Sequence, residues 1–261
     1  MTDFDTLSIT TAAQGVATLT LTRSAQLNAL NVQMLSDLIA ACAVLHRDRA
    51  VNAVVLTGEG KGFCAGYDLE EAGELAELSP EGMLERQDLA AEAILALRTL
   101  RQPVVAAING ATIGGGLSLA LAADIRIAAP SAVFSAAFVR LGLSGGDMGC
   151  SWHLPRLVGV GQAAELMLTG KQIDAAEAAR IGLVNNVAAN VVPEATSTAA
   201  AIAKHSPFGI ALTKRALYAN LDAPLTTGLE LESRGQAFAT RDHRFPEALA
   251  AVRAQVARHR E

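Results

Sequence analysis

The alternation of hydrophobic and polar residues predicts strands and helices that follow one another along the first part of the chain. Residues 16–22 alternate apolar and β-branched polar side chains, which is typical of a half-exposed strand, and residues 8–10 are placed to pair with it as a hairpin. Residues 51–57 are almost entirely apolar, which predicts a buried strand. Between these strands, Asn31 suits the N-cap of a helix whose apolar face extends to Leu45.

The same order of elements continues further along the chain. The spacing of apolar residues predicts a helix over residues 84–97, and residues 103–108 predict a second buried strand. A triglycine turn then opens an Ala/Leu-rich helix that ends at Ala122, and residues 124–128 form the next predicted strand. Repeated strand, turn and helix units with apolar strands indicate an α/β fold in which helices cover a parallel β-sheet.

The pattern changes after Trp152, where helices predominate. Helical spacing is found over residues 161–168, 174–180, 195–204, 209–220 and 226–239. The strand-like run between them is residues 182–187. We therefore divide the chain into a core of residues 1–195 and a helical region of residues 196–261, which we expect to pack on the core or on a neighbouring subunit.

Composition narrows the class of protein. The 261 residues carry a formal net charge of −5 and are 51% hydrophobic, which is typical of a globular protein and argues against nonspecific binding to nucleic acid. No apolar run reaches the length of a membrane span, and the acidic N-terminus lacks the features of a secretion signal. Three widely spaced cysteines fit reduced, buried thiols, and no Cys or His spacing supports a metal site. We therefore expect a soluble cytoplasmic protein without a metal.

Two glycine-bearing turns are the strongest indication of chemistry. The first comprises residues 63–69 (FCAGYDL) and the second residues 109–120 (NGATIGGGLSLA). Each follows an apolar run and precedes a helix-like segment, so each can present unpaired backbone N–H groups at a helix N-terminus. Facing one another, two such turns would make an oxyanion hole, in which fixed donors stabilise developing negative charge. The glycines at 114–116 also fit another role, the close packing of a helix on a sheet.

Several short motifs occur elsewhere in a fixed order. They are Arg23-(x)4-Asn28-Ala29-Leu30, Val54-Val55-Leu56-Thr57-Gly58, Pro103-Val104-(x)4-Asn109-Gly110, Leu154-Pro155-Arg156-Leu157-Val158-Gly159, Leu166-Met167-Leu168-Thr169-Gly170 and Ala178-(x)2-Ile181-Gly182-Leu183-Val184. With the two turns, these motifs make nearly the whole chain resemble the crotonase (enoyl-CoA hydratase/isomerase) superfamily. The resemblance implies a spiral of ββα units with a helical C-terminal region, assembled as a homotrimer or a dimer of trimers. It also implies an acyl-CoA thioester as substrate, with no cofactor besides.

The resemblance assigns roles to residues of both turns. The two oxyanion donors would be the backbone N–H groups of Tyr67 and Gly115, so the side chain at position 67 is free to vary. The residues expected to bind substrate are Gln26, Leu27, Ala65, Gly66, Asp68, Leu69, Glu70, Gly114, Ser118 and Phe138. Arg23, or the pair Lys214 and Arg215, could meet the CoA phosphates, since guanidinium and ammonium groups bind phosphate. Solvated surface charge is the alternative for each of these side chains.

The chain departs from the family's hydratases at two positions. Those enzymes use two glutamates as general acid and base, and the matching residues here are Ser118 and Phe138, which cannot do this work at neutral pH. Asp147, in the loop before a helix predicted over residues 151–158, is the remaining acid–base candidate, with His153 as a candidate partner. Asp147 fits an Asx-turn or an N-cap equally well, and His153 fits simple packing.

Two other functions remain open from the sequence. The loss of both glutamates fits an acyl-CoA-binding protein with little or no catalysis, because the same turns can bind a ground-state thioester. Residues 142–146 match the Gly-x-Ser-x-Gly pattern of a serine hydrolase, with Ser144 as the nucleophile. Glu70 and Glu71 are weaker acid–base candidates than Asp147.

Overall fold

The chain folds around a six-stranded mixed sheet, seen in a computed structural model that describes residues 4–258. Its strands, in spatial order, are β1 (Leu7–Ala12), β2 (Val16–Leu21), β3 (Ala53–Gly58), β5 (Val104–Ile108), β7 (Ile125–Ala128) and β10 (Asn186–Val187). β1 pairs antiparallel with β2, and every other neighbouring pair is parallel. The predicted hairpin and the predicted parallel sheet are therefore confirmed.

A second sheet of four short strands was not predicted. It contains β4 (Gly62–Cys64), β6 (Ala111–Ile113), β8 (Val133–Ser135) and β9 (Gln172–Asp174) in that order. The first three strands are parallel and β9 is antiparallel to β8. Each strand has three residues, too few for an alternating pattern to be recognised. Both glycine-bearing turns thus leave strands of this second sheet.

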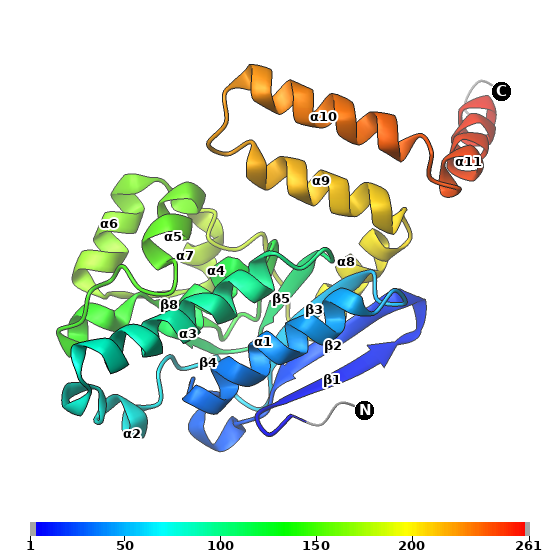
Figure 1. Cartoon of the computed structure of the whole chain (residues 1–261). Coiled ribbons are helices and arrows are strands. Elements are labelled where there is room, and N and C mark those ends of the chain that lie inside the picture. Colours follow the sequence, from blue (N-terminus) through cyan, green and yellow to red (C-terminus); the bar gives the residue numbers. More distant parts are fainter. Residues whose placement is uncertain (1–3, 259–261) are drawn as a thin grey trace. The chain divides into compact units, whose positions relative to one another are not determined.

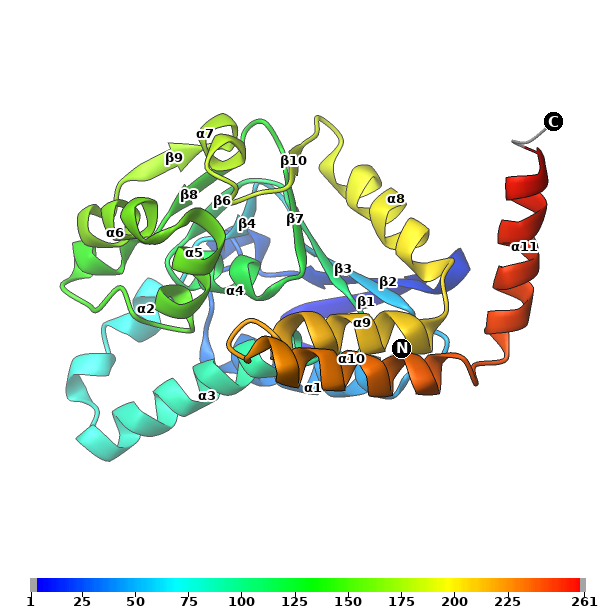
Figure 2. The same cartoon turned by 90° about the horizontal axis from the view of Figure 1, so that it is seen from above.

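Two long helices lie side by side, as the views from two directions show (Figures 1 and 2). They are α1 (Val32–Arg47) and α3 (Pro80–Arg98). Asn31 caps α1 as predicted, accepting a hydrogen bond from the Met34 N–H at 2.9 Å. Ser79 caps α3 in the same way, and Pro80 occupies the first helical position. The predicted helix over residues 84–97 is therefore one turn short at its N-terminus.

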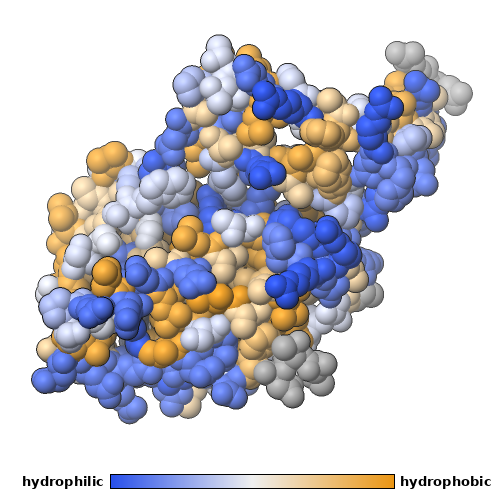
Figure 3. Space-filling model, viewed as in Figure 1, coloured by the Kyte–Doolittle hydropathy of each residue, from blue (hydrophilic) through white to orange (hydrophobic). Residues whose placement is uncertain are grey.

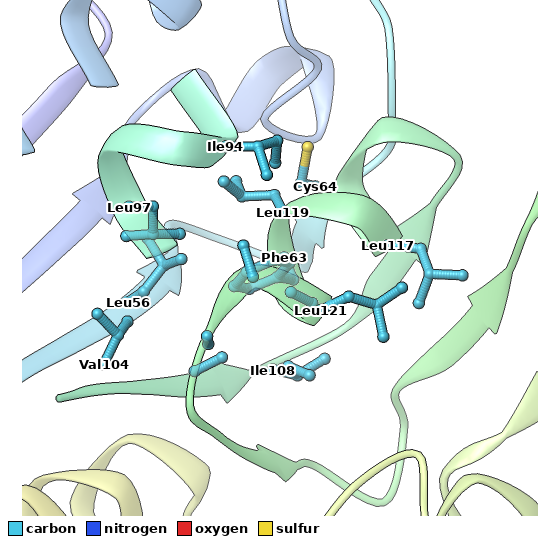
Figure 4. Packing of buried hydrophobic residues seen from close by; sticks show 14 of the residues in the cluster. Leu56, Phe63, Cys64, Ile94, Leu97, Val104, Ile108, Leu117, Leu119 and Leu121 are labelled. Atoms are coloured by element: carbon cyan, nitrogen blue, oxygen red, sulfur yellow. The ribbon is translucent and has the colours of Figure 1, made fainter. Parts of the chain in front are cut away.

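The short helix α4 (Gly115–Ala122) lies in the centre of the hydrophobic core. All eight of its residues are buried, which agrees with a sequence that is apolar on every side. Leu119 and Leu121 lie close to Phe63 of β4 in the packed interior (Figure 4). The helix that begins at the triglycine turn is thus held by apolar contacts around its whole circumference.

The rest of the first part contains shorter helices. They are η1 (Ala13–Gly15), η2 (Ser24–Gln26), α2 (Leu69–Ala72), η3 (Leu75–Glu77), η4 (Ala137–Leu141), α5 (Cys150–Val158), α6 (Val160–Thr169), α7 (Ala175–Arg180) and α8 (Val191–Ala203). The strand predicted over residues 182–187 is wrong in extent, because only its last two residues pair with β7. The three helices predicted over residues 161–204 are confirmed.

Contacts divide the chain into two compact units, one up to Ala200 and one from Ala201, a boundary that falls inside α8. The second unit contains α9 (Pro207–Ala219), α10 (Leu225–Ala239) and α11 (Arg244–Arg258). The first two were predicted and contact each other, whereas α11 was not predicted. The division at residue 195 stays a prediction. None of the helices in the described part of the chain is both long and apolar enough to cross a membrane.

Candidate active site

The two glycine-bearing turns lie against each other because β4 and β6 are neighbouring parallel strands. Both turns leave the C-terminal ends of these strands, the usual place for ligand sites in α/β proteins. Gly66 has φ +95°, and a Cβ atom there would lie 2.8 Å from the Ile113 carbonyl oxygen and 3.6 Å from the Gly115 nitrogen. The backbones of the two turns are therefore in contact, and only glycine fits between them.

The second turn changes directly from strand to helix. Gly114, with φ +52°, is the one residue between β6 and α4, and it is the N-cap position of α4 without a side-chain cap. The N–H of Gly115 belongs to the first turn of α4, where N–H groups have no partner within the helix. Close helix–strand packing, the other role considered for these glycines, is seen at Gly116, where a Cβ atom would lie 2.1 Å from the Cys64 carbonyl oxygen. Different glycines of the triplet thus have different functions.

Tyr67 is fixed by a single parallel bridge to Leu30. The Leu30 N–H donates to the Gly66 carbonyl at 2.7 Å, and the Asp68 N–H donates to the Leu30 carbonyl at 2.9 Å. The bridge therefore uses the groups on either side of the Tyr67 N–H and leaves that N–H directed away from Leu30. In residues 4–258, no backbone hydrogen bond outside the helices and strands uses it.

The segments expected to bind CoA lie beside the first turn. The Ala65 N–H donates to the Leu27 carbonyl at 3.0 Å, which brings residues 26–27 and 65–66 together. Gln26, Leu27, Leu69 and Glu70 are exposed, so their side chains are accessible to a ligand. Their role in binding stays a prediction.

The side chains of Asp68 and Arg23 have structural contacts within the protein. Asp68 is buried and forms an ion pair of 2.7 Å with Arg23, which also donates to the Ala29 carbonyl at 2.6 Å. Asp68 also caps α2 through the Glu70 N–H at 3.0 Å. The Arg23 guanidinium, considered for phosphate binding, is thus occupied by protein groups. The other candidates for that role, Lys214 and Arg215, lie in α9 of the second unit.

The two residues that replace the family's glutamates have structural contacts. Ser118 is fully buried and its hydroxyl donates to the backbone carbonyl of Asp147 at 3.1 Å. Phe138 is also buried, and its ring lies 3.7 Å from the position that a Cβ atom on Gly114 would occupy. Ser118 therefore holds the Asp147 loop to α4, and Phe138 packs on the second turn.

Asp147 is half-buried next to this site, and the structure shows how its loop is held. Its carbonyl accepts hydrogen bonds from both Ser118 and the Cys150 N–H, the latter at 2.9 Å. Met148, with φ +47°, places its sulfur 3.1 Å from where a Cβ atom on Gly115 would lie. The alternative role of Asp147 as an N-cap is wrong for α5, because the N-cap residue is Gly149 and no side chain bonds there.

The Asp147 carboxylate and the Tyr67 hydroxyl affect each other's protonation. Burial raises the pKa of Asp147, while the nearby donor groups of Tyr67 and of the Met148 backbone act in the opposite direction. Burial, together with the charge of Asp147, raises the pKa of Tyr67, so the phenol stays protonated at neutral pH. The Tyr67 hydroxyl oxygen is buried without a hydrogen bond of ordinary geometry to any described residue.

A small pocket opens beside Tyr67. It is lined by Tyr67, Asp68, Ala72, Leu75, Arg86 and Gln87. Arg86 forms an ion pair with Glu71, whose carboxylate also accepts from the Val32 N–H at 3.0 Å. Glu71, a weaker acid–base candidate, therefore joins three helices. The pocket lining thus combines the apolar residues Ala72 and Leu75 with polar and charged ones.

His153 packs in α5 and is not seen to contact Asp147 in the described residues. Its ring meets Trp152 edge to face, with centroids 4.7 Å apart, and Arg156 lies over the Trp152 ring at 4.1 Å. Burial, and then the charges of Arg98, Arg126 and Arg156, lower the pKa of His153 to about 4. The packing role is thus observed, with a neutral imidazole at pH 7.

The structure around Ser144 lacks the backbone conformation that a serine hydrolase requires at its nucleophile. A nucleophile elbow needs a strand before the serine and a helix after it. Here residues 137–141 form the 3-10 helix η4, and the Ser144 hydroxyl accepts from the Gly146 N–H at 3.1 Å in an exposed turn. Asp174, an acid that follows Ser144 in the order a serine hydrolase requires, caps α7 through the Glu177 N–H at 2.8 Å. We therefore do not retain Ser144 as a nucleophile.

Two adjacent glycine-bearing turns at strand ends, with one half-buried carboxylate beside them, make this region the candidate active site. Comparison with known proteins identifies the family, since residues 11–252 match the family model described as enoyl-CoA hydratase/isomerase. The chain belongs to this family of enzymes, within the crotonase superfamily. The α/β crotonase fold and the resemblance found in the sequence are both confirmed.

Individual relatives match over most of their length. A probable enoyl-CoA hydratase of Mycobacterium bovis, echA12, is 42% identical over 244 residues, which cover 90% of this chain and 86% of that protein. The solved structure of an enoyl-CoA hydratase from Bacillus anthracis superposes with a TM-score of 0.91 at 33% identity, covering 96% of this chain and 97% of that one. A second, from Polaromonas sp. JS666, gives 0.91 at 31% identity, covering 95% and 97%.

Proposed function

We propose that this enzyme binds an acyl-CoA thioester and stabilises its oxygen, as an enolate or oxyanion, with the backbone N–H groups of Tyr67 and Gly115. The contact between the Gly66 and Gly115 turns carries the proposal. Two donors fixed before the reaction stabilise developing charge without reorganisation, and removing one such donor commonly costs about 3 kcal/mol of transition-state stabilisation.

Strand spacing supports this pair of donors. β4 and β6 are hydrogen-bonded neighbours, and neighbouring strands lie about 4.8 Å apart. Each N–H donor lies roughly 2.9 Å from the oxygen that it binds. Donors on adjacent strand ends are therefore separated by a distance that lets both reach one oxygen from opposite sides.

Asp147 is the proposed proton-transfer group. A proton taken from the carbon beside the thioester passes to its carboxylate, while the C–H electron pair moves onto the thioester oxygen held by the two donors. Returning that proton to a different carbon shifts a double bond, which needs only one acid–base group. Hydration and thioester or carbon–carbon hydrolysis use the same charge stabilisation but also require an activated water.

The remaining parts of the proposal concern assembly and cellular place. The chemistry above needs no cofactor besides the CoA of the substrate. The three cysteines are buried, and none of them forms a disulfide within residues 4–258, which supports the prediction of a cytoplasmic protein. Exposed apolar side chains on α10 and α11, seen among hydrophilic ones in Figure 3, support the predicted homotrimer or dimer of trimers.

Substitution of Asp147 by Asn tests the proposed function. Wild-type and variant enzyme would be incubated with 3-enoyl-, 2-enoyl- and 3-hydroxyacyl-CoA thioesters, with products identified by mass spectrometry and separated from positional isomers by chromatography. We expect turnover to fall at least about 100-fold in Asp147→Asn, because a positioned acid–base group contributes that much. Binding of the acyl-CoA, measured by calorimetry, should change little.

Asp88→Asn is the matched control, because it makes the same change at an exposed position of α3. It should leave turnover unchanged. Equal turnover in wild type and Asp147→Asn would disprove the role of Asp147. Tight binding of acyl-CoA by a wild-type protein that turns over none of the substrates would support the second candidate, an acyl-CoA-binding protein, which the absence of glutamates at Ser118 and Phe138 favours.

A further inference from the structure

The surroundings of the Tyr67 side chain indicate a role that is separate from the role of its backbone N–H. Its hydroxyl oxygen is buried, lacks a hydrogen bond of ordinary geometry to any residue in the described part of the chain, and belongs to a side chain that lines the pocket with Gln87. A buried hydroxyl is costly unless it is hydrogen-bonded. The polar groups near this hydroxyl therefore indicate which hydrogen-bond partner is available to it.

Two polar side chains approach this hydroxyl from different elements. Gln87 of α3 lines the same pocket as Tyr67 and carries an amide N–H donor, and Asp147, whose charge acts on the phenol, carries a carboxylate acceptor. Donation from Gln87 to the Tyr67 hydroxyl, and from that hydroxyl to Asp147, would have one consistent direction. It ends at the one carboxylate that the proposed chemistry uses.

The backbone around Asp147 brings its carboxylate to this place. Ser118 holds the Asp147 carbonyl to α4, and Met148 packs on Gly115 of the second turn. Because Tyr67 lies on the first turn, the carboxylate, the phenol and both backbone donors share one small region.

Other charged and titratable groups near the pair are accounted for. Arg86 of α3 faces the phenol but is paired with Glu71. Cys150 of α5 is near Asp147, and burial raises the pKa of its thiol to about 12, so it stays neutral. Ionisation of Asp147 is therefore the event that the Tyr67 hydroxyl can influence.

We propose that the hydroxyl of Tyr67, supported by Gln87, is a positioning group that orients the Asp147 carboxylate for proton transfer. This inference rests on the proposed function of Asp147. One residue then has two separate roles, since its backbone N–H binds the thioester oxygen and its side chain directs the base. The phenol takes no proton itself, and it donates a hydrogen bond throughout.

Tyr67→Phe separates the two roles, because it keeps the N–H and the ring and removes only the hydroxyl. We expect kcat to fall about tenfold, with KM within about twofold, since a hydrogen bond to a charged group is worth about one power of ten or more. Loss of that bond raises the pKa of Asp147, so the acidic limb of the pH–rate profile should move up by about one pH unit. Gln87→Leu should move it in the same direction by less.

A second measurement does not depend on turnover. The pKa of Asp147 can be measured by NMR titration of protein with ¹³C-labelled aspartate, the resonance being assigned by its loss in Asp147→Asn. A higher pKa in Tyr67→Phe supports the proposal even if no tested substrate reacts. An unchanged pKa and an unchanged pH–rate profile overturn it, whereas unchanged turnover in Asp147→Asn overturns only the proposed function.

A purely structural role of Tyr67 gives a different result. If the hydroxyl only stabilised the fold, Tyr67→Phe would lower the free energy of unfolding and kcat without moving the pKa of Asp147. In the double variant Tyr67→Phe with Asp147→Asn, a structural effect of Tyr67→Phe would add to the loss of kcat caused by Asp147→Asn. A positioning effect would disappear, because the carboxylate that it acts on is absent. Circular dichroism and thermal unfolding of each variant establish that the folded proteins are compared.

Discussion

Gly66 is the residue on which the geometry of the site depends most directly. It combines a positive φ of 95° with a carbonyl oxygen 2.8 Å from the position of any added Cβ atom. Its own carbonyl also accepts the hydrogen bond from Leu30 that holds the Tyr67 bridge. A change at Gly66 therefore moves both turns at once.

Gly66→Ala should lower stability and activity together. The strained φ alone costs about 1–3 kcal/mol, and the contact with Ile113 adds to it. A shift of the donors by about 1 Å commonly reduces catalysis about 100-fold. Urea unfolding and turnover of the best acyl-CoA substrate measure the two effects.

Gly161→Ala is the matched control for Gly66→Ala. Gly161 lies in α6, and no atom lies within 4 Å of an added Cβ. The helix favours alanine over glycine, so stability should stay equal or rise slightly. An equal loss of activity in both variants would contradict the special role of Gly66.

Residues of the site differ in how far the sequence could predict them. The positions of Gly66 and Gly114 follow from local turn patterns, and both have the positive φ that such turns require. The surroundings of Asp147 depend on Ser118, which is 29 residues away, and on Tyr67 on another element. No local pattern encodes such contacts, so the loss of the N-cap role and the nearness of Asp147 to Tyr67 became visible only in the structure.

At the scale of elements, the length of a strand determined whether it could be predicted from the sequence. Strands β2, β3 and β5 have five or six residues and were predicted, whereas the three-residue strands β4, β6, β8 and β9 were not. The short strands are defined by pairing with distant segments rather than by their own sequence. The sequence therefore predicted the turns but not the strands that place them side by side.

Helix α5 gives the protein a defined sensitivity to acid through His153. The folded protein lowers the pKa of this imidazole to about 4, from an ordinary value of 6.5. The unfolded chain thus binds more protons than the folded protein between these pH values, so stability falls as pH drops through this range. At pH 4.5 this amounts to about 2 kcal/mol.

His153→Gln removes this titration. Between pH 7 and pH 4.5, its free energy of unfolding should fall by about 2 kcal/mol less than that of the wild type. The measurement is urea unfolding at both pH values. His243→Gln, at a side chain that is 86% exposed, should behave like the wild type. Parallel losses in all three proteins would show that the His153 environment does not affect stability.

At the scale of the whole molecule, α11 offers an apolar stripe for assembly. Phe245, Leu249, Val252 and Val256 recur at helical spacing and are 37–56% exposed. Such a stripe is typical of a surface that another copy covers. We expect light scattering to give three or six times the chain mass of 27.0 kDa.

Charge placed on this stripe should break the assembly. Leu249→Glu with Val252→Glu is expected to lower the particle mass measured by light scattering. Ala254→Glu, about half a turn round α11, is the control and should leave it unchanged. A monomeric wild type would contradict the predicted trimer.

The lone bridge between Leu30 and Tyr67 has a consequence for how new activities could arise. It holds the backbone of position 67 through Leu30, Gly66 and Asp68, and needs nothing from the tyrosine ring. A mutant library at this single codon would therefore vary the chemistry next to the substrate while the bridge is retained. Selection with different thioesters would then test which side chains at position 67 give new specificities.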